Sequence, residues 1–365
     1  MFQTVKIREG HDNFFTPLRL IFASLVVIGH AFAIAMRDPT LEPQILHHYT
    51  FSYLAVNMFF IASGFLVTKS MLYRGDAAGF TSARALRIFP ALIVHVLFVM
   101  LIIGPMSTNL PLREFFSSPD WYLQPLKVLT FYETAMFMPG TFASNAEQMG
   151  SAPLWTLRYE VLAYIGTLAI FMLGLMRKKW MVLAQFILPA IAYLVFYATG
   201  WVDYLPATGI NLLRFGIAYG LGATIYAYRK RLSFNWLVLP LLLGLTALTA
   251  KTPLVEITMN IFIAYFVMWA AYVKIPRLNW TQKLSDTSYG IYIYHWAVMQ
   301  MLFQWMPNLS VLALFAIGFP ITVILAWLSW TFVEKPMLSK KTWLANKWRS
   351  KRARPIYDPK AVLLD

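Results

Sequence analysis

The chain has 365 residues, of which 59% are hydrophobic and only 13% are charged, and its mean hydropathy is +0.58. These values exclude a soluble enzyme and indicate an all-α integral membrane protein with many spans. The sequence contains no cysteine, which excludes disulfides, thiolate metal sites and a cysteine nucleophile. The formal net charge is +15, and its distribution along the chain decides what it means.

Ten apolar stretches approach the length needed to cross a hydrocarbon core of about 30 Å. They are residues 17–36, 52–72, 85–104, 154–176, 180–200, 208–228, 234–250, 254–273, 287–306 and 309–333. The first is expected to begin with Thr16 as N-cap and Pro17 in the first turn. Because it contains Arg19 and His30, we interpret it as a retained span and not as a signal peptide.

The basic residues predict the orientation of these spans. With the N-terminus in the cytoplasm, nearly all basic residues outside the spans fall on the cytoplasmic side, where lysine and arginine accumulate in membrane proteins. The positive charge therefore indicates topology, with both termini cytoplasmic, and no nucleic-acid partner is expected. Residues 1–336 are predicted to form the membrane domain, and 337–365 a short basic cytoplasmic tail. Within the domain, residues 105–153 form an outer loop, either an interfacial lid or a passive connection.

Ionisable residues inside the spans are the first site candidates. Arg19 and His30 are eleven positions apart, so they share one helix face about 16 Å apart. Such groups are costly in a membrane unless they meet partners or line a cavity. Glu160 reaches a depth similar to that of His30, which predicts a carboxylate–histidine pair suited to general base catalysis. The alternative is that Glu160 pairs with Arg158 or a neighbouring arginine for structure alone.

Two shorter patterns lie in the second and third predicted spans. Arg84 and Arg87 face the same way at the cytoplasmic start of a helix and can grip phosphate, although taken alone they are better explained as membrane anchors. Ser63 and Gly64 lie mid-span, where small residues favour close helix packing. His95 also lies in a span, and a hydrogen-bonded core histidine is expected there. His47 and His48 are adjacent in a loop and have no metal-ligand spacing with a third group.

Six motifs then appear in the order expected for the membrane-bound acyltransferase family 3, which the chain resembles from Arg19 to Pro336. They are Arg19-x10-His30, the stretch NMFFIASGFLVTKS around Ser63 and Gly64, Arg84-xx-Arg87, the block from Trp155 through Arg158 to Glu160, SYGIYIYH with Tyr289, Tyr292 and His295, and Glu334-Lys335-Pro336. The resemblance implies a ten-span core. It also implies acyl transfer, commonly of acetyl, from cytosolic acyl-CoA to a hydroxyl of a cell-envelope glycan in the bacterial inner membrane.

The resemblance also implies that Arg19 and His30 are catalytic-site residues and that Arg84 and Arg87 form a functional pair. Our hypothesis places the donor phosphates near that pair, with the thioester arm passing Tyr292 and His295. His30, oriented by Glu160, removes the proton of the acceptor hydroxyl, and Arg19 steadies the donor or the developing oxyanion. An acyl-histidine relay is an alternative route.

The expected partners are acyl-CoA, an envelope glycan such as O-antigen or exopolysaccharide or a lipid-linked saccharide, and membrane lipids. Acetyl-CoA acts here as a substrate, and no permanently bound cofactor or metal is expected. Two alternatives to an enzyme come from other functional classes, and buried charge inside the spans suits transport as well as catalysis. One is a transporter or flippase, and the other is a structural subunit of a polysaccharide export system.

Overall fold

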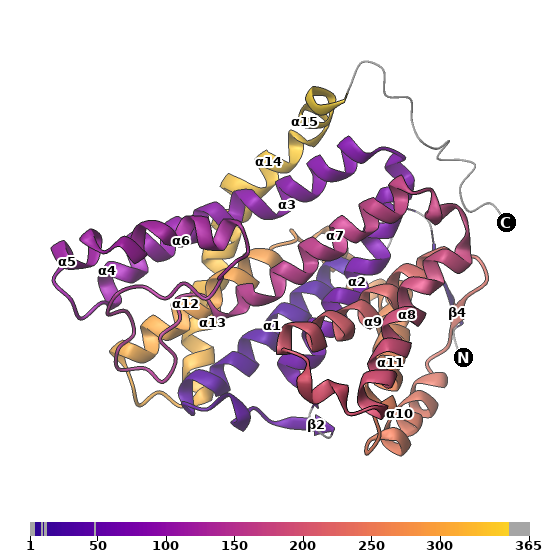
Figure 1. Ribbon diagram of the computed structural model, residues 1–365, viewed down its shortest axis with the longest axis horizontal. Helices are drawn as coiled ribbons and strands as arrows, with labels where there is room; N and C mark the ends of the chain where they lie inside the picture. The colour runs from indigo at the N-terminus through magenta and orange to yellow at the C-terminus, as the bar shows by residue number, and fades with distance from the viewer. Residues whose placement is uncertain (1–3, 9, 11–12, 47–48, 350–365) are drawn as a thin grey trace.

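A computed structural model describes residues 4–8, 10, 13–46 and 49–349, so the predicted tail lies outside the described residues from residue 350 onward. The long helices are α1 (Phe15–Ala35), α2 (Phe51–Arg74), α3 (Ala77–Phe98), α7 (Leu157–Met172), α8 (Lys179–Ala198), α9 (Ala207–Ala227), α10 (Val238–Thr249), α11 (Leu254–Tyr272), α12 (Ser288–Trp305) and α13 (Val311–Ser329). Each overlaps one of the ten predicted stretches (Figure 1). The all-α fold is therefore as expected.

Shorter elements connect these helices. They are α4 (Gly104–Ser107), α5 (Leu112–Ser117), α6 (Pro119–Leu129), α14 (Lys335–Ser339), α15 (Lys341–Trp348), the 3-10 turns η1 (Pro39–Leu41), η3 (Ala152–Thr156), η4 (Leu175–Arg177), η5 (Trp201–Tyr204) and η6 (Pro276–Lys283), and the π-helical turns η2 (Val99–Ile103) and η7 (Trp330–Glu334). The strands are β1 (Val5–Lys6), β2 (Gln44–Leu46), β3 (Tyr49–Thr50) and β4 (Ser233–Phe234). β1 pairs antiparallel with β4, and β2 with β3.

The helix lengths support a protein that crosses the membrane several times. Within the described part of the chain, six helical segments are long and apolar enough to span a bilayer. α10 is too short to cross the hydrocarbon core as a straight helix, because its 12 residues extend only about 18 Å and the core is about 30 Å thick. The protein is therefore a multi-pass membrane protein, while the count of ten spans stays a prediction.

The start of α1 differs from the sequence prediction. The helix begins at Phe15, and the backbone N–H of Phe15 donates to Oδ1 of Asn13 at 3.2 Å. Thr16 lies inside the first turn, so its prediction as N-cap is wrong. Pro17 is tolerated there because the first-turn N–H groups have no partner within the helix.

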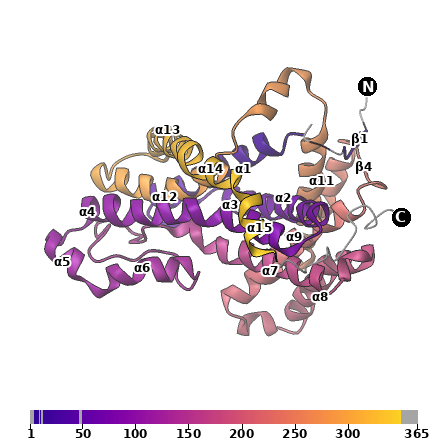
Figure 2. The same cartoon turned by 90° about the horizontal axis from the view of Figure 1, so that it is seen from above.

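Close helix packing organises the bundle. α2 packs along α9, α9 along α8, and α12 along α13, while α1 contacts both α2 and α12. α8 and α13 lie on opposite sides of the bundle (Figure 2). A Cβ atom on Gly64 of α2 would lie 2.0 Å from the carbonyl oxygen of Tyr219, and one on Gly222 of α9 would lie 2.0 Å from that of Ile61. These two helices can therefore approach only because both positions lack side chains, the packing expected around Ser63 and Gly64.

The segment from residue 105 to 153, which we call the outer segment after its predicted side of the membrane, packs against α12 at one end of the bundle, where α4, α5 and α6 lie in Figure 1. The indole N–H of Trp296 donates to the carbonyl oxygen of Met149 at 2.8 Å. The amide of Asn145 donates to Oε1 of Gln300 at 2.6 Å. These contacts make the segment a packed cover over the second half of α12.

The same segment is also tied to α3 through a histidine. His95 Nε2 lies 2.8 Å from Oγ of Ser151, and both residues are fully buried. His95 is thus the hydrogen-bonded core histidine that the sequence predicted. Its role is to join α3 to the end of the outer segment.

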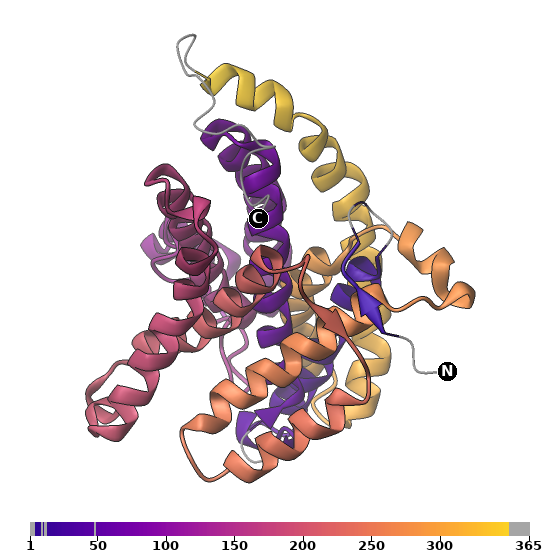
Figure 3. The same ribbon diagram turned by 90° about the vertical axis from the view of Figure 1, so that its right-hand side faces the viewer.

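Each described end of the chain is attached to another part of the fold. β1 pairs with β4, which lies between α9 and α10. Arg349 Nη2 lies 2.9 Å from Oδ2 of Asp76, in the turn between α2 and α3, and α15 packs on α3 (Figure 3). This arrangement fits two termini on one side of the membrane, although the cytoplasmic side itself stays a prediction.

Cysteine labelling in intact cells tests this orientation, since the native chain has no cysteine. Ser144 and Ser339 are both exposed, the first in the outer segment and the second at the end of α14. A membrane-impermeant thiol reagent should label Ser144→Cys in intact cells and Ser339→Cys only after the membrane is opened. The reverse pattern would contradict the predicted topology.

Candidate active site

A cavity of about 100 Å³, lined by both charged and apolar side chains, opens among α1, α2, α3, α7 and α12. Seven of the predicted site residues line it, namely Arg19, Ser63, Arg84, Arg87, Glu160, Tyr289 and Tyr292. Tyr164, Thr156 and Ser288 complete its polar wall, and Phe59 and Phe60 are among its apolar residues. Residues from five helices thus meet around one space within the bundle, which we call the arginine cavity.

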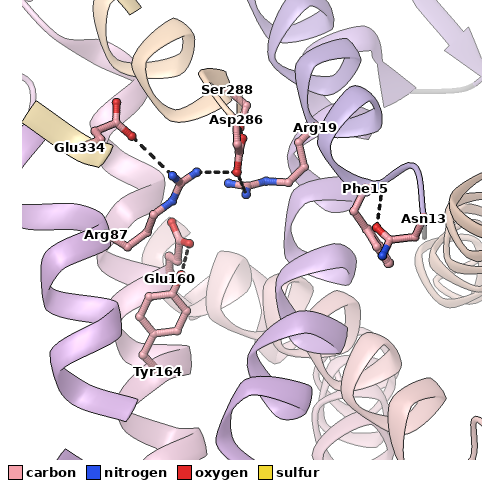
Figure 4. Close-up of polar contacts among 9 residues, drawn as sticks. All are labelled: Asn13, Phe15, Arg19, Arg87, Glu160, Tyr164, Asp286, Ser288 and Glu334. Carbon is pink, nitrogen blue, oxygen red and sulfur yellow. Dashed lines mark hydrogen bonds and ion pairs between the residues drawn. The ribbon is translucent and has the colours of Figure 1, made fainter. Parts of the chain in front are cut away.

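One carboxylate, Asp286, holds the arginine cavity together. Its Oδ2 accepts from Nη1 of Arg19 on α1 and lies 2.9 Å from Nη2 of Arg87 on α3 (Figure 4). Its Oδ1 accepts from the hydroxyl of Ser288 at 2.6 Å, at the start of α12. The bridge therefore fixes three helices relative to one another and neutralises part of the positive charge of two partly buried guanidinium groups.

Asp286 precedes α12, outside the membrane-spanning segment, and its ionisation follows from these contacts. Burial alone would raise its pKa. The positive charges of Arg19 and Arg87 and the hydrogen bonds from Ser288 outweigh burial and lower the pKa to about 2, from an ordinary value of 3.8. The carboxylate therefore stays charged at neutral pH and keeps both guanidinium groups in place.

Glu334 adds a second carboxylate to Arg87. Its Oε2 lies 3.5 Å from Nη1 of Arg87, and its Oε1 accepts from the hydroxyl of Ser329 at 3.2 Å. Glu334 is only 1% exposed and ends the π-helical turn η7. The Glu-Lys-Pro motif therefore acts by closing an ion pair with α3, in keeping with the frequent use of π-helical turns at functional sites.

Arg84 has a different environment from Arg87. Its guanidinium lies over the ring of Tyr164 at 5.5 Å, and its buried Nε has no hydrogen-bond partner among the described residues. Two carboxylates engage Arg87, whereas no acidic group within the described ranges forms an ion pair with Arg84. Arg84 is thus the member of the pair that remains available to an anion in the cavity.

The expected pair of His30 and Glu160 does not form. Glu160 accepts a hydrogen bond from the hydroxyl of Tyr164 inside the arginine cavity. His30 instead faces α12, with its Nδ1 2.7 Å from Nε2 of His295. Similar depth in the membrane placed the two residues at one level, but their side chains point to different neighbours.

Tyr292 separates the arginine cavity from the two histidines. Its hydroxyl lies 2.7 Å from Oγ1 of Thr156 and donates to the carbonyl oxygen of Pro153 at 2.9 Å. His295 follows about one turn later on α12, with its ring 6.2 Å from that of Tyr292. Of the two residues expected along the thioester arm, Tyr292 therefore lines the cavity and His295 lies behind it against His30.

Trp155 and Arg158 are also absent from the cavity lining. Trp155 packs against the rings of Tyr159 and Phe215, each 5.7 Å away. Arg158 has a buried Nε without a hydrogen-bond partner among the described residues, so pairing with Glu160 for structure alone is not what the structure shows. Both motif residues lie near the start of α7, and neither is among the residues that line the cavity.

Sequence reasoning missed Asp286, which is the centre of the arrangement. Its partners are distant along the chain, and the carboxylate stands outside every predicted span. The available signal was an acidic residue directly before an apolar stretch, followed two positions later by Ser288. Such a residue is typical of a helix start, so the pattern alone indicated capping.

Replacing Asp286 by Asn should destabilise the protein far more than removing an exposed ion pair. Its loss leaves two guanidinium groups without their shared counter-charge, which typically costs about 3–5 kcal/mol. Asp76→Asn is the matched control, because Asn keeps the helix cap and the exposed pair with Arg349 is worth at most about 1 kcal/mol. Thermal unfolding in detergent compares them, and equal midpoints would show that Asp286 is not the structural centre.

Comparison with known proteins identifies the family of the chain. Residues 13–331 match the model of a family described as "Acyltransferase domain". The chain is 30% identical to "Nodulation protein 10" of Rhizobium leguminosarum bv. viciae, over 93% of this chain and 96% of that protein. It is 26% identical to "O-acetyl transferase" of Shigella phage Sf6, over 91% and 97% of the two chains. No solved structure matches the chain.

The family match covers all of the helices that build the arginine cavity and both histidines behind it. The two relatives are matched over nearly their whole lengths, so the similarity extends beyond one motif. The chain therefore belongs to acyltransferase family 3 and is a multi-pass membrane acyltransferase.

Proposed function

We propose that the protein transfers an acyl group, with acetyl the expected one, from cytosolic acyl-CoA to a hydroxyl of a cell-envelope glycan. Its place of action would be the bacterial inner membrane. The name of the Shigella phage relative supports O-acetyl transfer as the reaction. The charge pattern supports a donor from the cytoplasm, because the arginine cavity lies toward the side where the basic residues accumulate.

One observation carries this proposal. Arg84, which no acidic group among the described residues engages, and His30, whose side chain is partly exposed, lie on opposite sides of the wall formed by Tyr292 and Thr156. An acyl-CoA has an anionic end that suits a guanidinium and a thioester end that must meet the acceptor. The two groups thus suit the two ends of one donor, with Tyr292 between them.

The proposed reaction uses His30 as general base. His30 takes the proton of the acceptor hydroxyl while the hydroxyl oxygen attacks the thioester carbonyl carbon. A carbon–oxygen bond forms, the carbon–sulfur bond breaks, and the imidazolium of His30 returns its proton to the released thiolate of CoA. The products are the O-acylated acceptor and CoA, and no metal or redox partner is needed for the balance.

In the proposed mechanism, Arg19 steadies the donor. Asp286 fixes one of its terminal nitrogens, while 24% of its side chain remains exposed and the residue lines the cavity. A guanidinium held in this way loses little further freedom when it binds an oxygen atom of the donor or the developing oxyanion. Glu160 belongs to the same cavity, and its hydrogen bond from Tyr164 fixes that ring beneath Arg84.

Mass spectrometry of envelope glycans tests the function as a whole. Cells with and without the chain should differ by acyl groups on one glycan, and the His30→Gln variant should match the cells without it. An unchanged acyl pattern on every glycan would contradict the proposal and favour transport across the membrane instead.

The two arginines should respond differently to substitution. Arg84→Ala should weaken acyl-CoA binding by about tenfold or more while leaving thermal stability nearly unchanged, because it removes a charge-assisted contact with the donor. Arg84→Lys should recover only part of the affinity, since lysine lacks the planar fork.

Arg87→Ala is the matched comparison in the same donor titration. It should mainly lower the unfolding temperature, because it leaves Asp286 and Glu334 without their partner. Loss of donor affinity in Arg87→Ala with full stability, and normal affinity in Arg84→Ala, would reverse the assignment.

His30→Gln separates chemistry from architecture. Glutamine keeps a hydrogen-bond donor and an acceptor but cannot act as a base. Acyl transfer at matched expression and matched thermal stability should fall by about 10²–10⁴-fold, the usual effect of losing a positioned base. Near-normal transfer would remove His30 from the mechanism.

A further inference from the structure

His30 and His295 form a defined pair between α1 and α12. Nδ1 of His30 lies 2.7 Å from Nε2 of His295, and the two rings are 5.0 Å apart and inclined by only 9°. Trp296 meets the ring of His30 edge-on at 5.2 Å, at an angle of 89°. The position and the tilt of the His30 ring are therefore fixed from two sides.

The second nitrogen of His295 determines where the protons of the pair lie. Nδ1 of His295 is 3.1 Å from the carbonyl oxygen of Ile291, one turn earlier on α12. A carbonyl oxygen only accepts hydrogen bonds, so this Nδ1 carries the proton. In a neutral ring the other nitrogen, Nε2, then has a free lone pair. Because Nε2 of His295 can only accept, Nδ1 of His30 must donate, and the lone pair of His30 is on its Nε2.

Exposure distinguishes the two rings. His295 is fully buried, whereas part of the His30 side chain remains exposed. Nε2 of His30 has no hydrogen-bond partner among the described residues, and this nitrogen is not fully buried. The nitrogen that holds the free lone pair is therefore the one that a substrate can reach.

We propose that His295 is a positioning residue that selects the tautomer of His30 and so presents Nε2 as the catalytic base. This inference rests on the proposed function, in which His30 deprotonates the acceptor hydroxyl. When Nε2 takes up that proton, His30 becomes an imidazolium whose Nδ1–H donates to His295 more strongly. The chain from Ile291 through His295 to His30 then stabilises the cation that forms during the reaction.

A neutral imidazole suits this task inside a membrane protein. Hydrolytic triads commonly use a carboxylate to orient the histidine, but a permanent charge at this depth would be costly without a further partner. His295 supplies the required acceptor without adding a charge to the resting enzyme. The same argument explains why Glu160 can remain in the arginine cavity and leave His30 to another partner.

Three substitutions at position 295 separate positioning from packing. His295→Gln can place an amide oxygen near the former Nε2 and accept from His30, whereas His295→Asn is too short to reach it. His295→Leu fills the space without an acceptor. We expect kcat to fall by about 10²-fold in the Leu and Asn variants at unchanged donor KM, and by no more than about tenfold in the Gln variant.

His95→Gln is the matched control, because His95 is an equally buried histidine that bonds Ser151 and not His30. This variant should keep kcat within about twofold of the native enzyme at matched stability, since His95 makes no hydrogen bond with His30 or His295 among the described residues. Equal losses in all three variants at position 295, or a raised donor KM at unchanged kcat, would overturn the proposal. The second result would instead indicate donor binding by His295.

Nitrogen NMR of the native protein, labelled with ¹⁵N-histidine, decides the tautomer without any activity. The resonances of His30 are those that disappear in His30→Gln. We expect Nδ1 of His30 to carry the proton and Nε2 to be free, and His295→Leu should abolish this preference. A proton on Nε2 of His30 would refute the positioning role of His295 even if acyl transfer is confirmed. The expected spectrum without acyl transfer would refute only the proposed function.

Discussion

The bridge from Asp286 to Arg19 and Arg87 is the interaction on which the site depends. Three helices that are far apart in sequence meet at this carboxylate, and each guanidinium would otherwise be a costly, partly buried charge. The bridge also gives the two paired arginines different environments. Because Asp286 and Glu334 engage Arg87, the cavity keeps Arg84 as a cationic group that a donor can use.

From this bridge, the residues of the site follow one another along α12. Ser288 supports the bridge, Tyr292 closes the cavity against Thr156, and His295 contacts His30. One helix therefore carries the structural anchor, the wall and the partner of the proposed base on successive turns. The outer segment strengthens this helix beyond His295 through Trp296, so the part of the site opposite the arginines is also held in place.

The sequence predicted the all-α membrane fold because apolar length and charge asymmetry are properties of single segments. It also predicted Arg19, Arg84 and Glu160 as site residues, and the structure places all three around one cavity. It did not reveal Asp286, whose partners Arg19 and Arg87 lie 267 and 199 positions away. It also paired His30 with Glu160, because depth follows from residue counting whereas the direction of a side chain depends on how helices rotate against one another.

We conclude that one helix bundle both binds the donor and carries out acyl transfer, and that the donor enters from the side of the arginine cavity. Transfer in sealed membrane vesicles of known orientation tests it most directly. Isotope-labelled acetyl-CoA should label the saccharide acceptor only when it is supplied to the cytoplasmic face, and Arg84→Ala should lower this labelling by about tenfold or more at low donor concentration. Equal labelling from the opposite face, or labelling independent of Arg84, would contradict the account.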